Sequence, residues 1–218
     1  MTVTVKYMEN IIEKIIEKIP QDIFTDDVLI NLLQGTPARR YGIVKRAISA
    51  GKIIHIKRGL YALAERYQRK SINLFEMGQI IYGPSYISFE SALNYHRWIP
   101  EAVYSVTSAC VKNSKEFFTH YGTFSYKRIP FSMIYLGVER LSSPDGTFLM
   151  ASPWKAIADY VYAYKKEWKG IDPVIKSLRV EKENLEDADK ELLSHMEEQY
   201  NNARVKRFIR GVKKDLGL

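Results

Sequence analysis

Residues 35–52 read GTPARRYGIVKRAISAGK and contain the start and stop signals of one short helix. Thr36 is a suitable N-cap, and Pro37 suits the first helical position, where its missing amide hydrogen is no loss. Gly51 is typical of a residue that follows the last helical turn. We therefore expect a helix from Pro37 to about residue 50, and the segments around it indicate the fold.

Two helices are predicted before this segment and a hairpin after it. Isoleucines at three-and-four spacing predict a helix over Tyr7–Ile19, and Thr25 is a suitable N-cap for a second helix over Asp26–Leu33. Beyond the third helix, KIIHIK (residues 52–57) and LYAL (residues 60–63) flank a glycine turn, as the two strands of a hairpin do. Three helices followed by a hairpin are the outline of a winged helix-turn-helix.

We expect this N-terminal domain over residues 1–70, and its charge indicates a polyanionic partner. The whole chain has a net charge of +8, and residues 34–70 hold ten Lys or Arg against Glu65 alone. A solvated protein face normally mixes both charge signs, so a segment of one sign indicates contact with phosphates. Double-stranded DNA is therefore the predicted partner. Two alternatives are an ordinary solvated basic helix and a surface that binds an acidic protein.

The helical period predicts which side of the third helix faces the partner. At 100° per residue, Tyr41, Val44 and Ile48 fall on one side and are expected to pack on the other helices. Arg39 and Arg46 fall on the opposite side, where a glycine lets the backbone approach a groove closely. The residues predicted to contact DNA, with those at the hairpin tip, are Thr36, Arg39, Arg40, Gly42, Ile43, Arg46, Lys57 and Arg58.

Beyond residue 70 the pattern changes to short strands and helices, so we expect a second domain over residues 71–218. Ser88 is an N-cap for a helix over 89–98, and Ser152-Pro153 begins another. Helices are also predicted from about residue 166 to the C-terminus. Strands are predicted within residues 102–111, 122–130, 132–138 and 146–152. The expected fold class is α+β, with a mostly antiparallel sheet and a helical C-terminus.

Several other classes of protein are not favoured. Pro144-Asp145 and Glu167-x-Lys169 fit the spacing of a large nuclease superfamily, but Glu-x-Lys must lie on a strand there and here it follows a helical pattern. The four histidines lie far apart, and no phosphate-binding loop is found, so neither a metal nor a cofactor is predicted and we do not expect an enzyme. No apolar run of membrane-spanning length occurs, so a cytoplasmic protein is expected. Cys110 is expected to be a packing residue.

Three segments together resemble the AbiEi family of antitoxins, which belong to toxin-antitoxin and phage abortive-infection systems. They are KRGLYAL (residues 57–63), YISFESALNYHRW (residues 86–98) and MASPWKAIADYVY (residues 150–162). The matched positions are Gly59, Tyr61, Leu63, Tyr86, Ile87, Ser88, Ser91, Ala92, Leu93, His96, Ala151, Pro153, Lys155, Ala156 and Asp159. Two positions depart from the family pattern: Ser152 stands for Thr, and Trp154 stands for the usual Glu.

The resemblance implies an antitoxin that is also a transcriptional autorepressor. Its winged helix would bind inverted repeats in its own promoter, which suit a dimer on DNA, and its second domain would counteract a nucleotidyltransferase-like toxin encoded beside it. The motif residues singled out in the second domain are Ser88, Ser91, His96, Lys155 and Asp159. His96 is either functional or bound to a carbonyl at a helix end, and Asp159 is either structural or directed at a partner. The alternative function is a DNA-binding regulator without antitoxin activity.

Overall fold

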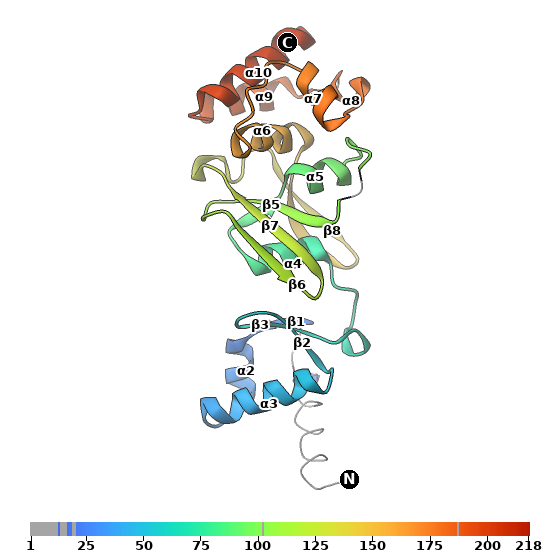
Figure 1. The fold of residues 1–218 in the computed structure, drawn as a ribbon, viewed down its shortest axis with the longest axis vertical. Helices are drawn as coiled ribbons and strands as arrows, with labels where there is room; N and C mark the ends of the chain where they lie inside the picture. The colour runs from blue at the N-terminus through green and yellow to red at the C-terminus, as the bar shows by residue number, and fades with distance from the viewer. Residues whose placement is uncertain (1–12, 14–16, 19–20, 102, 187) are drawn as a thin grey trace. The chain divides into compact units, whose positions relative to one another are not determined.

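The computed structural model describes residues 13, 17–18, 21–101, 103–186 and 188–218 (Figure 1). The contacts within the chain divide it into two compact units, one of residues 1–73 with 119–121 and the other of residues 74–118 with 122–218. The helix predicted over Tyr7–Ile19 lies outside the described residues, except for residues 13, 17 and 18. Within the described ranges, no helix combines the length and the apolar character that crossing a bilayer requires.

The first unit contains two described α-helices and a small antiparallel sheet. Its elements are β1 (Ile23–Thr25), α2 (Asp26–Leu32), α3 (Pro37–Ser49), β2 (Ile53–Lys57), β3 (Leu60–Leu63) and the 3-10 helix η1 (Glu65–Tyr67). The strand order is β1-β3-β2. The β2–β3 hairpin is as predicted, whereas β1 was not predicted because three residues are too short for a strand pattern.

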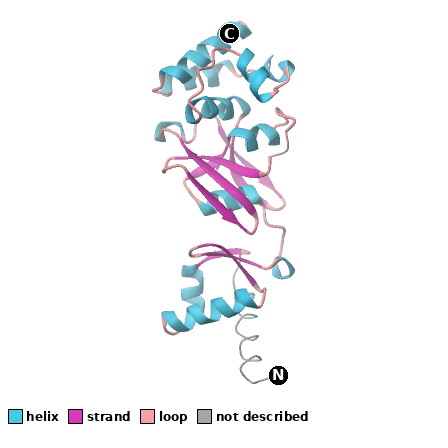
Figure 2. Ribbon diagram, viewed as in Figure 1, coloured by secondary structure: helices cyan, strands magenta, loops and turns pink. Residues whose placement is uncertain are grey.

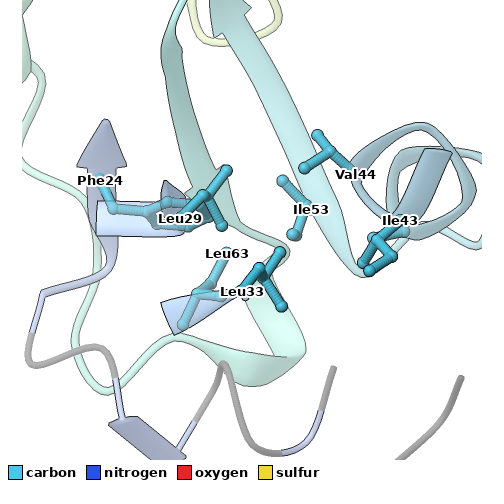
Figure 3. Packing of buried hydrophobic residues seen from close by; sticks show 8 residues of the cluster. Phe24, Leu29, Leu33, Ile43, Val44, Ile53 and Leu63 are labelled. Atoms are coloured by element: carbon cyan, nitrogen blue, oxygen red, sulfur yellow. The ribbon is translucent and has the colours of Figure 1, made fainter. Parts of the chain in front are cut away.

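The core of the first unit lies between the two helices and the sheet. Figure 3 shows side chains of α2, α3 and the strands directed toward one another. The cluster consists of Phe24, Leu29, Leu33, Ile43, Val44, Ala47, Ile53 and Leu63. Because α2 and α3 both bury their apolar stripe against this sheet, the hairpin and α3 are held as one body.

The second unit is built on a six-stranded sheet. Its elements are α4 (Leu74–Ile81), β4 (Ser85–Ile87), α5 (Phe89–Tyr95), β5 (Ser105–Cys110), β6 (Lys115–Thr119), β7 (Gly122–Arg128), η2 (Phe131–Met133), β8 (Val138–Ser143), β9 (Gly146–Ala151), α6 (Pro153–Ala163), α7 (Asp172–Leu178), α8 (Lys182–Glu186), α9 (Lys190–Gln199) and α10 (Ala203–Leu216). The strand order is β6-β7-β5-β4-β9-β8. This sheet is mostly antiparallel, as predicted, although β4–β9 and β5–β7 are parallel pairs.

The strand predicted within residues 132–138 was wrong. That segment contains the end of η2 and a turn in which Gly137 has a φ of 66°, and the strand β8 begins only at Val138. Pro130 precedes η2 and cannot donate a ladder hydrogen bond, so the apolar residues after it pack from a 3-10 turn instead. Helix α4 and strand β6 were not predicted.

The C-terminal helices belong to the core of the second unit. Helix α10 packs on both α6 and α9, and Figure 2 shows these helices gathered together beyond the sheet. Asn202 caps α10 by accepting hydrogen bonds from two backbone amides, and Gly217 ends it with a φ of 68°. The buried side chains of these helices are Val174, Leu178, Leu185, Leu193, Met196, Val205, Phe208, Ile209 and Val212. The fold class is therefore α+β with a helical C-terminus, as predicted.

Candidate nucleic-acid interface

All the charged side chains on the exposed face of α3 are positive. Arg39, Lys45 and Arg46 are exposed, and α3 contains no acidic residue between its first and last positions. Gly42 lies between them and is half-buried, with the guanidinium of Arg46 3.7 Å from the position that a Cβ on this glycine would take. The result is a low, positively charged surface along one helix. Lys45 was not among the residues predicted to contact DNA, although it directly precedes Arg46 in the sequence.

The face predicted for α3 was rotated by about one residue, and this corrects two assignments. Ile43, predicted to contact DNA, is 3% exposed, whereas Tyr41, predicted to be in the core, is 70% exposed. Ile43, Val44 and Ala47 pack against the sheet, because an aliphatic side chain gains more from burial than a phenol that must keep its hydroxyl hydrated. Ile43 is therefore a core residue and no longer a candidate for DNA contact.

The arginines at the start of α3 also hold the turn that precedes it. Thr36 caps the helix as predicted, because its Oγ1 accepts from the amide of Arg39 at 3.3 Å. Nη1 of Arg40 donates to the carbonyl of Gly35 at 2.6 Å, and Nη1 of Arg39 donates to that of Gln34 at 3.4 Å. Each guanidinium has five N–H donors, so one bond to the turn leaves donors for a phosphate. Arg40, which is half-buried, contributes mainly to the turn.

The tip of the β2–β3 hairpin is fixed to the start of α2. The amide of Asp26 donates to the carbonyl of Gly59 at 3.1 Å, and Gly59 has a φ of 75°, which the turn requires. Arg58 is exposed at this tip, and Lys57 is half-buried. Burial, together with the hydrogen bond to Asp26, raises the pKa of Tyr61 to about 12, so this phenol stays protonated on the adjacent strand. The turn therefore presents Arg58 from a rigid support.

Not all of the positive charge in residues 34–70 is available to a partner. Nη1 of Arg69 lies 3.0 Å from Oδ1 of Asp22, a carboxylate that is almost fully buried. The guanidinium of Arg66 lies over the ring of Tyr67, at 4.7 Å from its centre. We define the basic face as the exposed residues Arg39, Lys45, Arg46 and Arg58 with Gly42.

Three motif residues of the second unit meet at one buried carboxylate. Oδ1 of Asp159 accepts from Nζ of Lys155 at 2.5 Å and from the hydroxyl of Tyr200. Its Oδ2 accepts from the hydroxyls of Tyr86 at 2.7 Å and Ser88 at 2.8 Å. We call these five residues the Asp159 cluster. Its charged members, Lys155 and Asp159, have no exposed surface, which makes the role of Asp159 structural.

The surroundings set the protonation of the Asp159 cluster. Burial raises the pKa of Tyr86 and Tyr200 well above the ordinary value, and the charge of Asp159 raises both further. Burial lowers the pKa of Lys155, while its contact with Asp159 acts in the opposite direction. The two phenols therefore remain donors to a carboxylate whose hydrogen-bonding sites are well occupied.

Sequence reasoning found only part of the Asp159 cluster. Tyr86 lies within the matched segment, but its hydroxyl gave no separate signal, and Tyr200 lies 41 residues beyond Asp159. Ser88 occupies the N-cap position of α5, as predicted, yet its side chain makes no cap bond and donates to Asp159 instead.

The remaining motif residues make local contacts within the fold. Oγ of Ser91 donates to the carbonyl of Ser105 at 3.1 Å and accepts from the amide of Thr107 at 2.8 Å, which joins α5 to β5. Nε2 of His96 lies 3.1 Å from the carbonyl oxygen of Ala151, so the carbonyl-bound alternative describes it. Trp154, which stands for the usual Glu, is 3% exposed and packs edge-on against Trp98. An acid at this position would therefore be buried.

The geometry does not fit the nuclease alternative. Asp145 lies in the turn between β8 and β9, and Glu167 lies in the segment after α6, outside any strand. Glu167 is paired with Arg204 at 2.7 Å and also with Arg207. Among the described residues, no three His, Cys, Asp or Glu side chains gather as a metal site would need.

Four of the six basic residues of helix α10 pair with acids of neighbouring segments. Besides the two arginines that pair with Glu167, Arg210 and Lys213 pair with Glu197 of α9 at 2.7 and 3.1 Å. These hydrogen bonds lower the pKa of Glu197, so the pairs persist to acidic pH. Four of the positive charges of α10 therefore hold neighbouring segments together. We take the basic face of the first unit, where no acid lies on α3, as the candidate interface.

Comparison with protein-family models and curated proteins identifies no relative of the chain. No protein-family model matches the chain, and no curated protein matches it.

Proposed function

We propose that the protein binds duplex DNA through its first unit, and that it is the antitoxin and transcriptional autorepressor of a toxin-antitoxin operon. The observation that carries the DNA-binding half is the basic face: three exposed cations on α3, no acid on that helix, and Arg58 on the hairpin. In this proposal α3 is a recognition helix and the β2–β3 hairpin is the wing of a winged helix-turn-helix.

The dimensions of DNA support this assignment. The major groove admits an α-helix, and the residues of a recognition helix reach base edges while neighbouring cations contact phosphates. Arg39 and Arg46 are separated by two helical turns, so both can follow one groove. Gly42 between them has no side chain, which keeps the middle of the face low.

The antitoxin half of the proposal rests on the resemblance to the AbiEi family. The Asp159 cluster supports a specific version of it, because Ser88, Lys155 and Asp159 are buried together and stabilise the second unit. These motif residues would therefore maintain the domain that opposes the toxin, and any contact with the toxin would use other, exposed residues. A cytoplasmic location follows from a function on promoter DNA.

The DNA-binding half is tested with a labelled fragment from upstream of its own gene, by fluorescence anisotropy over a range of salt. For four or five phosphate contacts, the slope of log K against log salt should be about −4. The double variant Arg39→Ala, Arg46→Ala should bind at least about 30-fold more weakly and flatten the slope by about 2. Unchanged affinity would show that α3 is not the recognition helix.

The matched control for this test is Arg140→Ala, Lys182→Ala, which removes the same two positive charges from exposed positions of the second unit. It should bind as the unaltered protein does. Equal losses in the two double variants would mean that net charge, not the basic face, determines binding. If instead an acidic protein occupies the basic face, DNA affinity would be weak and would not depend on sequence.

The antitoxin half is tested by expressing the neighbouring reading frame alone and together with this protein. Growth arrest that only co-expression relieves is the expected result. The Arg39→Ala, Arg46→Ala variant should still relieve arrest when both genes are expressed from a foreign promoter, because that experiment bypasses autorepression. No arrest, or arrest without relief, would leave the alternative of a DNA-binding regulator without antitoxin activity.

A further inference from the structure

The second unit contains a cavity for which the proposed function gives no role. Its volume is about 590 Å³, within the range of small-molecule sites. It lies over β5 and β7, between the start of α5, the end of α6 and α7, and is open on one side. Thr107 and Ser125 are register partners on these parallel strands, and both line it. Its apolar walls are Ile99, Val103 and Leu178.

Glu90 is a poorly solvated carboxyl group in the wall of this cavity. Its Oε2 is shielded from solvent and accepts no hydrogen bond within the described structure. Burial raises the pKa of Glu90, while a hydrogen bond from its own backbone amide and the nearby charge of Lys127 act in the opposite direction. A carboxylate that has already lost hydration gains more from an approaching cation than one that is fully hydrated.

The other charges of the wall are also mainly negative. Glu101 and Glu116 line the cavity with Glu90, against the single ammonium of Lys127. Glu101 already has a partner, since Arg179 lies 3.2 Å from its carboxylate. Nζ of Lys127 lies 5.6 Å from the centre of the Tyr164 ring, which also lines the cavity. Two carboxylates therefore face one cation, with an aromatic ring and aliphatic side chains beside them.

We propose that this cavity binds an organic cation, with a primary ammonium or guanidinium head near Glu90 and a short aliphatic chain against Ile99 and Leu178. Such a head can donate hydrogen bonds to a carboxyl group whose Oε2 has no partner, and the cavity volume accommodates the chain. The cation is either a free small molecule or a Lys or Arg side chain of a partner protein.

The test uses the full chain and two probes, n-butylammonium and n-butylguanidinium, with butyrate as the probe of opposite charge. Backbone amide shifts of Thr107, Ser125 and Lys127 should move and saturate, with a dissociation constant on the order of 1 mM for so small a ligand. Butyrate should not shift them. Saturable binding of butyrate without binding of either cation would overturn the proposal. So would the absence of binding of every probe at about 50 times the expected dissociation constant.

Two variants that remove a negative or a positive charge from the cavity wall should change cation affinity in opposite directions. Glu90→Gln should weaken binding of the cations at least tenfold, whereas Lys127→Gln should strengthen it about threefold. Glu139→Gln on β8 removes the same charge at an exposed position outside the cavity and should change nothing. Equal affinity in Glu90→Gln and the unaltered protein would overturn the assignment of Glu90.

Stability distinguishes binding from a structural role of Glu90. Because its shielded oxygen has no hydrogen-bond partner, Glu90→Gln should unfold at a temperature no lower than the unaltered protein, while binding is lost. A large loss of stability would contradict the proposal. An arginine-containing pentapeptide with blocked ends distinguishes the two sources: binding at least as tight as butylguanidinium supports a partner side chain, and weaker binding supports a free small molecule.

Discussion

Lys155 and Asp159 stand one turn apart in α6, with 2.5 Å between Nζ and Oδ1, and neither side chain is exposed to solvent. An ion pair at the same spacing occurs in α7, where Asp172 and Lys176 are 3.2 Å apart and about three-quarters exposed. The two pairs share their spacing and differ in environment. Together they allow the effect of burial to be measured within one protein.

Replacing the buried lysine should be far more damaging than replacing the exposed one. Lys155→Met leaves Asp159 buried without its cation, and we expect the free energy of unfolding to fall by about 3–5 kcal/mol. Lys176→Met should change it by less than about 0.5 kcal/mol. Urea denaturation followed by circular dichroism measures both. Similar small losses in the two variants would contradict the structural role of the Asp159 cluster.

Alkaline pH should destabilise the protein through tyrosines whose pKa is raised by folding, of which Tyr86 and Tyr200 are fully buried. Tyr61 and Tyr164 have pKa values of about 12 in the folded chain, and those of Tyr86 and Tyr200 are well above 10. Because the unfolded chain releases these protons near pH 10, their contribution is complete below pH 10 and is lost as pH rises through 12.

Lys155 affects the pH dependence in the opposite direction, because its pKa is lowered in the folded chain. Its contribution to the free energy of unfolding stops changing near pH 10.5, where the lysine of the unfolded chain also loses its proton. The free energy of unfolding should therefore decline above about pH 10.5. Urea denaturation at a series of pH values measures it, and absorbance at 295 nm should show tyrosines that ionise only on unfolding. A stability that stays flat to pH 12 would contradict these pKa shifts.

Ile43 and Tyr41, whose burial on α3 was predicted the wrong way round, should differ in their sensitivity to alanine substitution. Ile43→Ala removes buried methyl groups from the core cluster and should lower the free energy of unfolding by about 2–5 kcal/mol. Tyr41→Ala changes an exposed side chain and should alter it by less than about 0.5 kcal/mol. Thermal and urea denaturation test this pair. A larger loss for Tyr41→Ala than for Ile43→Ala would mean that Tyr41 is the buried residue, as helical periodicity predicts.

Gly42→Ala should separate stability from DNA binding. A Cβ at this position would lie in ordinary contact with the Arg46 guanidinium, so the methyl group fits. Because alanine favours a helix more than glycine does, the free energy of unfolding should rise by about 0.5–1 kcal/mol. The added methyl group on the basic face should weaken promoter binding in the anisotropy assay. Unchanged binding would show that DNA does not approach the backbone here.

The bounds of α3 could be predicted because they depend on local chemistry. Thr36, Pro37 and Gly51 act within one turn of the positions that they occupy, and no distant contact changes their effect. The buried face of α3 could not be predicted with the same success. Apolar residues occur on both sides of that helix, and contact with the sheet decides which of them are buried.

The second unit shows the same distinction. Tyr86, Ser88 and Asp159 could be singled out as parts of matched segments, but not as partners, since 71 or more residues separate Asp159 from the other two. The cavity around Glu90 collects residues from several separate elements, and the sequence contains no signal for it. Contacts between residues far apart in the sequence form only in the folded chain, so sequence patterns did not predict them.

The position of Tyr200 has a consequence for the order in which the chain matures. Asp159 has its lysine beside it as soon as α6 forms, but its fourth donor is synthesised 41 residues later, at the end of α9. A nascent second unit therefore cannot complete its interior until the C-terminal helices have left the ribosome, whereas the first unit is already whole. Translation that stops early would release a protein with an intact basic face and an unfinished second half.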